Sequence, residues 1–138
     1  MNINMEHINP TTVVPPQGLY SHIVKVPAGT DLLFISGQLG IKPDGSTPDT
    51  IEAQADQVFS NIVTLLRSQG LGVDSIVKLS TFIVSGHDGQ AVRNARIKYL
   101  GEHRPASTAV YVSQLVDPAW FVEVEAIAAG RASAGHAS

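Results

Sequence analysis

The 138-residue chain contains no cysteine, which excludes disulfide bonds, thiolate metal ligands and a cysteine nucleophile. Charge is also scarce, because only 15% of the residues are Asp, Glu, Lys or Arg, against about a quarter in an average soluble domain. A surface with so few charges suggests that a partner covers part of it. An ordinary monomer is equally compatible with this composition, so the oligomeric state stays open at this point.

The chain also has no basic cluster and no long apolar run. Its nine Lys and Arg residues are scattered and the formal net charge is −3, whereas proteins that bind nucleic acids usually carry a basic face. No apolar stretch approaches the ~20 residues of a membrane span. Residues 1–10 have neither the basic nor the apolar region of a secretory signal. We therefore expect a cytoplasmic protein with no nucleic acid and no membrane partner.

Length and hydrophobic content indicate one domain. A chain of 138 residues, 43% of them hydrophobic, can bury roughly two-thirds of its unfolded surface in a single core. No internal repeat or linker interrupts residues 1–138, which we interpret as one domain. Within it, residues 1–16 are polar and rich in proline and predict an extended lead-in. Residues 131–138 are small and polar and predict a frayed tail.

Two strands are predicted ahead of the first helix. Residues 19–27 alternate, with Tyr20, His22, Val24 and Val26 on one face, and residues 31–38 follow the turn at 27–29. Because so short a turn separates them, the two strands are expected to pair as a hairpin. A loop follows over residues 39–49.

The first helix has clear start and stop signals. Asp49 is the predicted N-cap, and Glu52 lies three residues on, which is the spacing of a capping box. Gly70 is expected to end the helix. Residues at helical spacing form its apolar stripe: Ile51, Ala55, Val58, Ile62 and Leu65.

The second half of the chain continues with a strand, a helix and two strands. The predicted ranges are 76–84 for the first strand, 90–103 for the helix, and 108–115 and 120–129 for the two last strands. The core candidates of this helix are Val92, Ala95, Tyr99 and Leu100. The order β-β-α-β-α-β-β predicts an α+β fold in which two helices cover one face of a sheet. The other face must meet water or a partner.

The last strand has two unlike faces. With period two, Val122, Val124, Ala126 and Ala128 fall on one face, and Phe121, Glu123, Glu125 and Ile127 on the other. The first face suits packing against helices. The second mixes carboxylates with large apolar groups, as expected of a subunit interface that holds a polar site. Solvated or ion-paired glutamates on an ordinary exposed strand remain an equally good interpretation.

An ordered set of residues makes the chain resemble a known family. The set comprises Ser36-Gly37-Gln38 at a strand end, Gln54, Asn61, Leu65, Gly70, Val77-Lys78, Asn94, Pro105-Ala106 and the run from Val122 to Ala128. In this order and spacing the chain is similar to the RidA/YjgF family of reactive-intermediate deaminases, once called endoribonuclease L-PSP. The resemblance covers about residues 17–130.

The resemblance implies a fold, an assembly and an activity. Members of this family have a chorismate-mutase-like α+β fold and form homotrimers whose sheets line a central barrel, with small-molecule pockets between subunits. The best-known members hydrolyse enamines and imines to 2-keto acids and ammonia, with neither a metal nor an organic cofactor. For this chain the resemblance therefore implies no cofactor, a homotrimer, and a small-molecule substrate at the subunit interfaces.

The resemblance also assigns roles to individual positions. Tyr20 matches the family's pocket tyrosine, Ser36 the serine at the strand end and Asn94 the asparagine on the second helix. Glu123 matches the glutamate that handles the attacking water, which makes it the candidate catalytic residue. Ser107 and Ala109 take positions where the family has a substrate-binding arginine and, often, a cysteine. We assign both to substrate binding, through backbone donors and the Ser107 hydroxyl.

The absent arginine bears on the substrate. A bidentate Arg–carboxylate contact is much stronger than one neutral hydrogen bond from Ser107, so the preference should shift away from small imino acids. Arg93 and Arg96, which flank Asn94, are candidates for a relocated anchor, but we favour a solvated helix face for both. The five histidines show no metal-ligand spacing, so no metal site is expected.

Two functions are consistent with these residues. The first is RidA-like hydrolysis of enamines, imines or related C–N substrates, with Glu123 activating water. The second is a non-catalytic trimer that binds a metabolite or a protein. The retained Glu123 favours the enzyme, and the missing arginine favours the binding protein.

Overall fold

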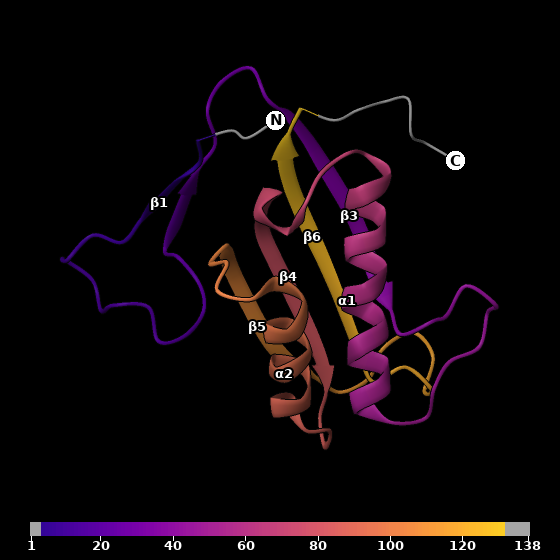
Figure 1. Ribbon diagram of the computed structural model, residues 1–138. Coiled ribbons are helices and arrows are strands. Elements are labelled where there is room, and N and C mark those ends of the chain that lie inside the picture. The colour runs from indigo at the N-terminus through magenta and orange to yellow at the C-terminus, as the bar shows by residue number, and fades with distance from the viewer. Residues whose placement is uncertain (1–3, 132–138) are drawn as a thin grey trace.

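The computed structural model describes residues 4–131 and contains one four-stranded sheet with two helices on one of its faces (Figure 1). Strand order is β3-β6-β4-β5, in which β4 and β5 run parallel and the other neighbours antiparallel. The sheet and the helices on it comprise, in chain order, β3 (Asp31–Leu39), α1 (Ile51–Ser68), the short 3-10 helix η1 (Val73–Ser75), β4 (Ile76–Val84), α2 (Gly89–Leu100), β5 (Ala106–Val112) and β6 (Val122–Gly130). The predicted α+β class with both helices on one face of a mixed sheet is confirmed. The tail expected over residues 131–138 lies outside the described residues, apart from residue 131.

The predicted hairpin of residues 19–27 and 31–38 is wrong. Only Ile23–Lys25 forms a strand there, β2, and it pairs with β1 (Glu6–Ile8) from the lead-in. The strand β3 pairs instead with β6, almost a hundred residues away, over nearly its whole length. Nine-residue β6 offers β3 many more ladder hydrogen bonds than three-residue β2 can, so the distant pairing prevails over the short turn. The β1–β2 ribbon lies to one side of the sheet (Figure 1).

Helix α1 starts one residue later than predicted. The Thr50 side chain accepts a hydrogen bond from the Ala53 backbone N–H, so Thr50 is the N-cap and the capping box of Asp49 with Glu52 is not formed. The predicted stop at Gly70 is confirmed. Gly70 has a φ of 71°, and the Leu71 N–H donates to the Leu66 carbonyl, as in a Schellman turn.

The apolar stripe of α1 ends at Leu66 and not at Leu65. Leu66 is 1% exposed and Leu65 is 40% exposed. Leu66 follows Ile62 by four residues, as Ile62 follows Val58, so these three side chains lie on the same side of the helix. Phe59, absent from the predicted stripe, is fully buried beside Ile62. The other predicted members of the stripe are buried.

Three further boundaries differ from the predictions. Helix α2 ends at Leu100, three residues early, because Gly101 adopts a φ of 58° that L-residues avoid. Strand β5 is shifted two to three residues toward the N-terminus, and β6 begins at Val122. The core candidates of α2 were correct: Val92, Ala95 and Leu100 are buried, and Tyr99 packs against the core.

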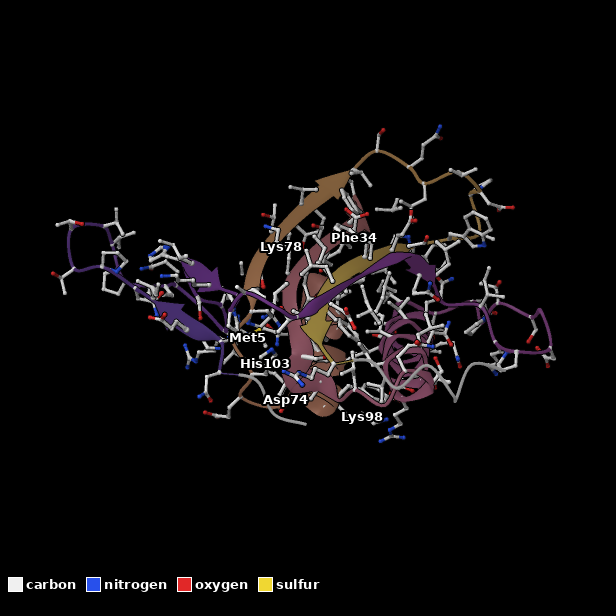
Figure 2. The ribbon with its side chains drawn as sticks, turned by 90° about the horizontal axis from the view of Figure 1, so that it is seen from above. Met5, Phe34, Asp74, Lys78, Lys98 and His103 are labelled. Carbon is white, nitrogen blue, oxygen red and sulfur yellow. The ribbon has the colours of Figure 1, made fainter. Side chains whose placement is uncertain are left out.

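The predicted alternation of β6 separates the two faces of the sheet. The helix-covered face buries all four predicted residues: Val122, Val124, Ala126 and Ala128. The opposite face, which we call the open face, carries Glu123, Glu125 and Ile127 together with Phe34 of β3, which is 74% exposed. Figure 2 shows the labelled Phe34 and Lys78 on the side of the sheet away from the helices.

Candidate functional site

Glu123, the candidate catalytic residue, lies at an irregularity of the sheet. The pairing of β3 with β6 slips between Ile35 and Gln38, which places Ser36 and Gly37 in a bulge. A Cβ atom at Gly37 would lie 2.8 Å from Cδ of Glu123 and closer still to its Oε2. The Glu123 carboxylate therefore lies directly against the backbone of Gly37. A side chain at position 37 would occupy the space that the carboxylate fills. Ser36, exposed, is in the same bulge, so the structure brings these two predicted site residues together.

Gln54 of α1 holds the chain just before Glu123. Gln54 is fully buried, and its Nε2 donates to the carbonyls of Pro48 and Ala119, at 2.9 and 2.8 Å. Its Oε1 accepts from the Phe121 N–H at 2.8 Å. One amide thus satisfies three backbone groups and fixes the entry into β6 from the helix side. Gln54 belongs to the family resemblance, but no role was predicted for it from the sequence.

A pocket of about 320 Å³ lies on the open face beside this bulge. Its polar lining comes from Ser36, Lys78, Ser80 and Glu125, and Phe34 and Ile127 supply apolar walls. The Lys78 ammonium donates to Thr108 Oγ1 at 3.0 Å. Glu125 lines this pocket, whereas Glu123 does not.

Ser107 and Ala109 lie on the other face of the sheet. Each is directly opposite a buried residue of β4 in the parallel ladder, Ser107 opposite Leu79 and Ala109 opposite Thr81. Neighbours in register share a face, so both side chains point toward α2. A pocket of about 340 Å³ lies here between α2 and β5, with Ala109, Arg93 and Arg96 in its lining. We call it the α2–β5 pocket.

The segment that carries Tyr20 is held by two arginines, one on α2 and one just before β5. The Arg96 guanidinium donates to the Leu19 carbonyl, and Arg104 Nη1 donates to the Gly18 carbonyl at 3.1 Å. Tyr20 itself is half-buried, and its hydroxyl accepts from the Gln17 N–H at 3.0 Å. Tyr20 also stacks edge-on against His22, with the ring centroids 5.8 Å apart. Two arginines therefore hold residues 18 and 19, and one of them, Arg96, also lines the α2–β5 pocket.

Arg96 does not lie on a solvated helix face, contrary to our expectation. It is half-buried, and its Nη2 donates to Ser107 Oγ at 3.2 Å as well as to the Leu19 carbonyl. Burial lowers the pKa of the Arg96 guanidinium, and the positive charge of Arg93 lowers it further. Arg93 is exposed, as expected. Asn94 is exposed as well, and its Oδ1 accepts from Gln90 Nε2 at 3.0 Å.

The predicted site residues therefore form two groups on opposite faces of one sheet. Ser36 and Glu123 are on the open face, whereas Ser107 and Ala109, with Tyr20 close by, are on the helix-covered face. Within one chain the sheet separates these groups. No role was predicted from the sequence for Gly37 or Gln54. For Gly37 the available signal was its position inside a predicted strand, since a glycine there often marks a bulge.

Comparison with known proteins agrees with this fold. Residues 11–130 match the endoribonuclease L-PSP family. The chain belongs to the RidA/YjgF/L-PSP family. The match covers both groups of site residues and all seven elements of the sheet and helix layers.

Relatives of this family include proteins from yeast, plants and bacteria. Protein HMF1 of Saccharomyces cerevisiae is 34% identical over 116 residues, which cover 81% of this chain and 84% of the relative. Reactive Intermediate Deaminase A, a chloroplastic protein of Arabidopsis thaliana, is 30% identical over 113 residues, 80% of this chain and 58% of that protein. A crystal structure of a Rid-family protein from Yersinia pestis has a TM-score of 0.80 and 29% identity, and the match covers 91% of this chain and 98% of that one.

Two further features of the described residues concern metals and membranes. Among residues 4–131, no three His, Asp or Glu side chains are arranged to hold a metal ion. Neither helix of the described part of the chain is long and apolar enough to cross a membrane.

Proposed function

We propose that this member of the RidA/YjgF/L-PSP family hydrolyses imines or enamines, with Glu123 as the residue that activates water. Membership of a family that includes a protein named Reactive Intermediate Deaminase A supports the reaction class. The placement of the Glu123 carboxylate against Gly37 supports the choice of residue, because the bulge holds it on the open face and away from the apolar core.

The proposed reaction needs only acid–base chemistry. Glu123 accepts a proton from water as the water oxygen bonds to the C=N carbon, and the C=N electron pair moves to nitrogen. Protonated Glu123 returns this proton to the nitrogen, which gives the carbinolamine. The carbinolamine hydroxyl then passes its own proton to the nitrogen as the C–N bond breaks, so ammonia leaves and the oxygen forms the keto group. An enamine first takes up a proton at carbon and then follows the same path. No electron is gained or lost, so no redox cofactor is required.

We propose further that the chain is a homotrimer with its substrate sites between subunits. The two groups of site residues lie on opposite faces of the sheet, so a complete site needs one group from each of two chains. Large apolar side chains are exposed on β3 and β5, the two edge strands: Leu32, Phe34, Val110 and Tyr111. Such side chains are typical of an interface that one chain alone leaves uncovered.

Sedimentation equilibrium at micromolar concentration tests this assembly. The expected mass is three times that of one chain, about 44 kDa from 14.6 kDa each. A monomer across this concentration range would contradict the shared site, and the proposed function with it.

The substrate preference of the proposed enzyme is shifted away from the smallest imino acids. Ser107 offers a single hydroxyl at the position where the resemblance implies a bidentate arginine, and that hydroxyl already contacts Arg96. A neutral hydrogen bond contributes about 1 kcal/mol against 1.5–3 kcal/mol for one to a charged group, which weakens binding of a small carboxylate placed at Ser107.

Ammonia release from a panel of imines tests the activity. An amino-acid oxidase generates the imines in situ, and the wild type is compared with Glu123→Gln, which keeps the side-chain shape but loses the proton acceptor. Glu125→Gln is the matched control, because Glu125 is two residues along the same face of β6. We expect a loss of at least a hundredfold for Glu123→Gln and little change for Glu125→Gln. Equal losses in the two variants would contradict the role of Glu123.

The second candidate function is a non-catalytic trimer that binds a metabolite or a protein. The serine at position 107 favours it, because the strongest anion-binding group implied by the resemblance is absent from β5. The same imine panel separates the candidates. If every imine decays at the buffer rate while small acids still bind, the chain is a binding protein.

A further inference from the structure

Arg96 carries a positive charge that no acidic side chain neutralises among the described residues. The one ion pair within residues 4–131 joins Lys98 to Asp56, on the other side of α2. The two hydrogen bonds of Arg96 leave from Nη2 and end on neutral oxygens, the Leu19 carbonyl and Ser107 Oγ. Its Nε is buried with no hydrogen-bond partner. A half-buried guanidinium in this condition retains both charge and donors for an anion.

A second arginine, Arg93, adds positive charge beside Arg96. Arg93 precedes Arg96 by one helical turn, so both side chains project from one side of α2 and line the α2–β5 pocket. Arg93 Nη1 also lies beside Gly18, 3.8 Å from the position that a Cβ atom would take there. Two neighbouring like charges repel unless a negative charge lies near both. The pocket therefore favours an anionic group near the Arg96 end.

The remaining walls of the α2–β5 pocket are largely apolar. Ile83 and Val92 are buried in its floor, and Ala109, Val110 and the ring of Tyr111 form its side on β5. At about 340 Å³ the pocket is within the range of small-molecule sites, roughly 300–1,000 Å³. It therefore matches a ligand with a charged end and an apolar body.

We propose that the α2–β5 pocket binds carboxylic acids with a bulky apolar chain, with Arg96 as the anion-binding residue. The guanidinium reaches this place from α2 and not from β5. The space above the small side chain of Ala109 is consequently left for the body of the ligand. A short acid such as pyruvate would leave the apolar walls uncovered, and its affinity would be correspondingly low. The assignment of these acids as products of imine hydrolysis rests on the proposed function, whereas their binding does not.

Calorimetric titration of the full chain with three probes tests the proposal. The probes are 4-methyl-2-oxopentanoate, pyruvate and the uncharged methyl ester of 4-methyl-2-oxopentanoate. We expect the branched acid to bind at least tenfold more tightly than either pyruvate or the ester. Equal affinity for the acid and its ester would overturn the anion site, and equal affinity for pyruvate would overturn the apolar body.

Arg96→Gln tests the residue itself. The variant should bind the branched acid at least tenfold more weakly, because a charge-assisted contact is lost. Arg67→Gln, which removes the same charge from an exposed position of α1, is the matched control and should bind as the wild type does. Wild-type affinity in Arg96→Gln would refute the proposal.

Arg96 also holds the Leu19 carbonyl, so thermal unfolding is measured for each variant. If Arg96→Gln does not fold, Arg96→Lys replaces it, since a lysine keeps the charge but not the planar fork. Its affinity for the branched acid should fall three- to tenfold, and an unchanged affinity would refute the proposal. The result is independent of turnover. A wild type that binds the branched acid through Arg96 but hydrolyses no imine would refute the enzyme and support the pocket.

Discussion

The two faces of the sheet differ in how much of their apolar surface a single chain buries. On the helix-covered face, apolar side chains of β4 and β6 such as Leu79 and Val124 are fully buried under α1 and α2. On the open face, Phe34 stays 74% exposed next to a pocket that contains Lys78 and Glu125. The first face is buried within the chain, whereas the second stays exposed in one chain and would be covered in the proposed trimer. The contrast implies that the helix-covered face contributes most of the stability of a single chain.

The largest expected effect compares Leu79→Ala with Phe34→Ala. Leu79→Ala leaves a cavity under the helices and should lower the free energy of unfolding by about 3 kcal/mol, equally at every protein concentration. Phe34→Ala acts only through assembly, so its effect should be small in dilute solution and should grow with concentration. Denaturant titrations over a hundredfold range of concentration check both. A large decrease in the free energy of unfolding of the monomer by Phe34→Ala would contradict this difference between the two faces.

The next effect concerns substrate choice on the helix-covered face. Ser107→Arg should raise kcat/KM for 2-iminobutanoate by ten- to a hundredfold, because a guanidinium on β5 would add a bidentate ionic contact to a short carboxylate. A neutral imine of similar size is the control and should show no gain. Because the new guanidinium would lie beside Arg96, thermal unfolding is followed in parallel. No gain in a folded trimer would show that Ser107 does not limit the reaction.

A smaller effect concerns the bulge on the open face. Gly37→Ala places a Cβ within 2.8 Å of Glu123 Cδ, so the carboxylate must move while the buried helix contacts remain. We expect about a tenfold loss of imine hydrolysis with little loss of stability. Gly72→Ala is the control, since its Cβ would meet only the tip of Asp74, at 3.2 Å. If the two substitutions lower activity equally, the close approach of Glu123 to Gly37 has no role in the reaction.

The smallest effect lies on the outer surface of the helices. The ammonium of Lys98 is 2.6 Å from Asp56 and lowers the pKa of that carboxyl below 3.8. The ion pair therefore contributes stability above about pH 3.8 and loses it as the pH falls through the lower pKa of the folded state. Because both side chains are largely exposed, Asp56→Asn should cost far less than Leu79→Ala at pH 7. Unfolding at pH 7 and at pH 3 checks this, and a cost near that of Leu79→Ala would mean that the helix layer depends on this pair.

Local patterns predicted much of the fold. The period of two assigned the faces of residues 122–128 correctly, and Gly70 correctly marked the end of α1. Phe121, predicted on the face of Glu123, instead lies outside β6 and packs against the core. The start of α1 was wrong by one residue, because Asp49 and Thr50 are both good N-caps and only the backbone conformation decides between them. The hairpin was wrong because the partner of β3 is distant in sequence, and local turn signals carry no information about distant pairing.

The sequence by itself determined the class of fold, the family and the identity of the candidate residues, since periodicity and ordered motifs are properties of the chain. Only the tertiary structure decided where these residues lie. It placed Glu123 and Ser107 on opposite faces of the sheet, and it brought Arg96 of α2 to the hydroxyl of Ser107 on β5. A helix residue meets a strand residue only after crossover and packing fix the distance between them. The sequence shows a serine at position 107, whereas only the packing of α2 on β5 brings the Arg96 guanidinium within hydrogen-bond distance of it.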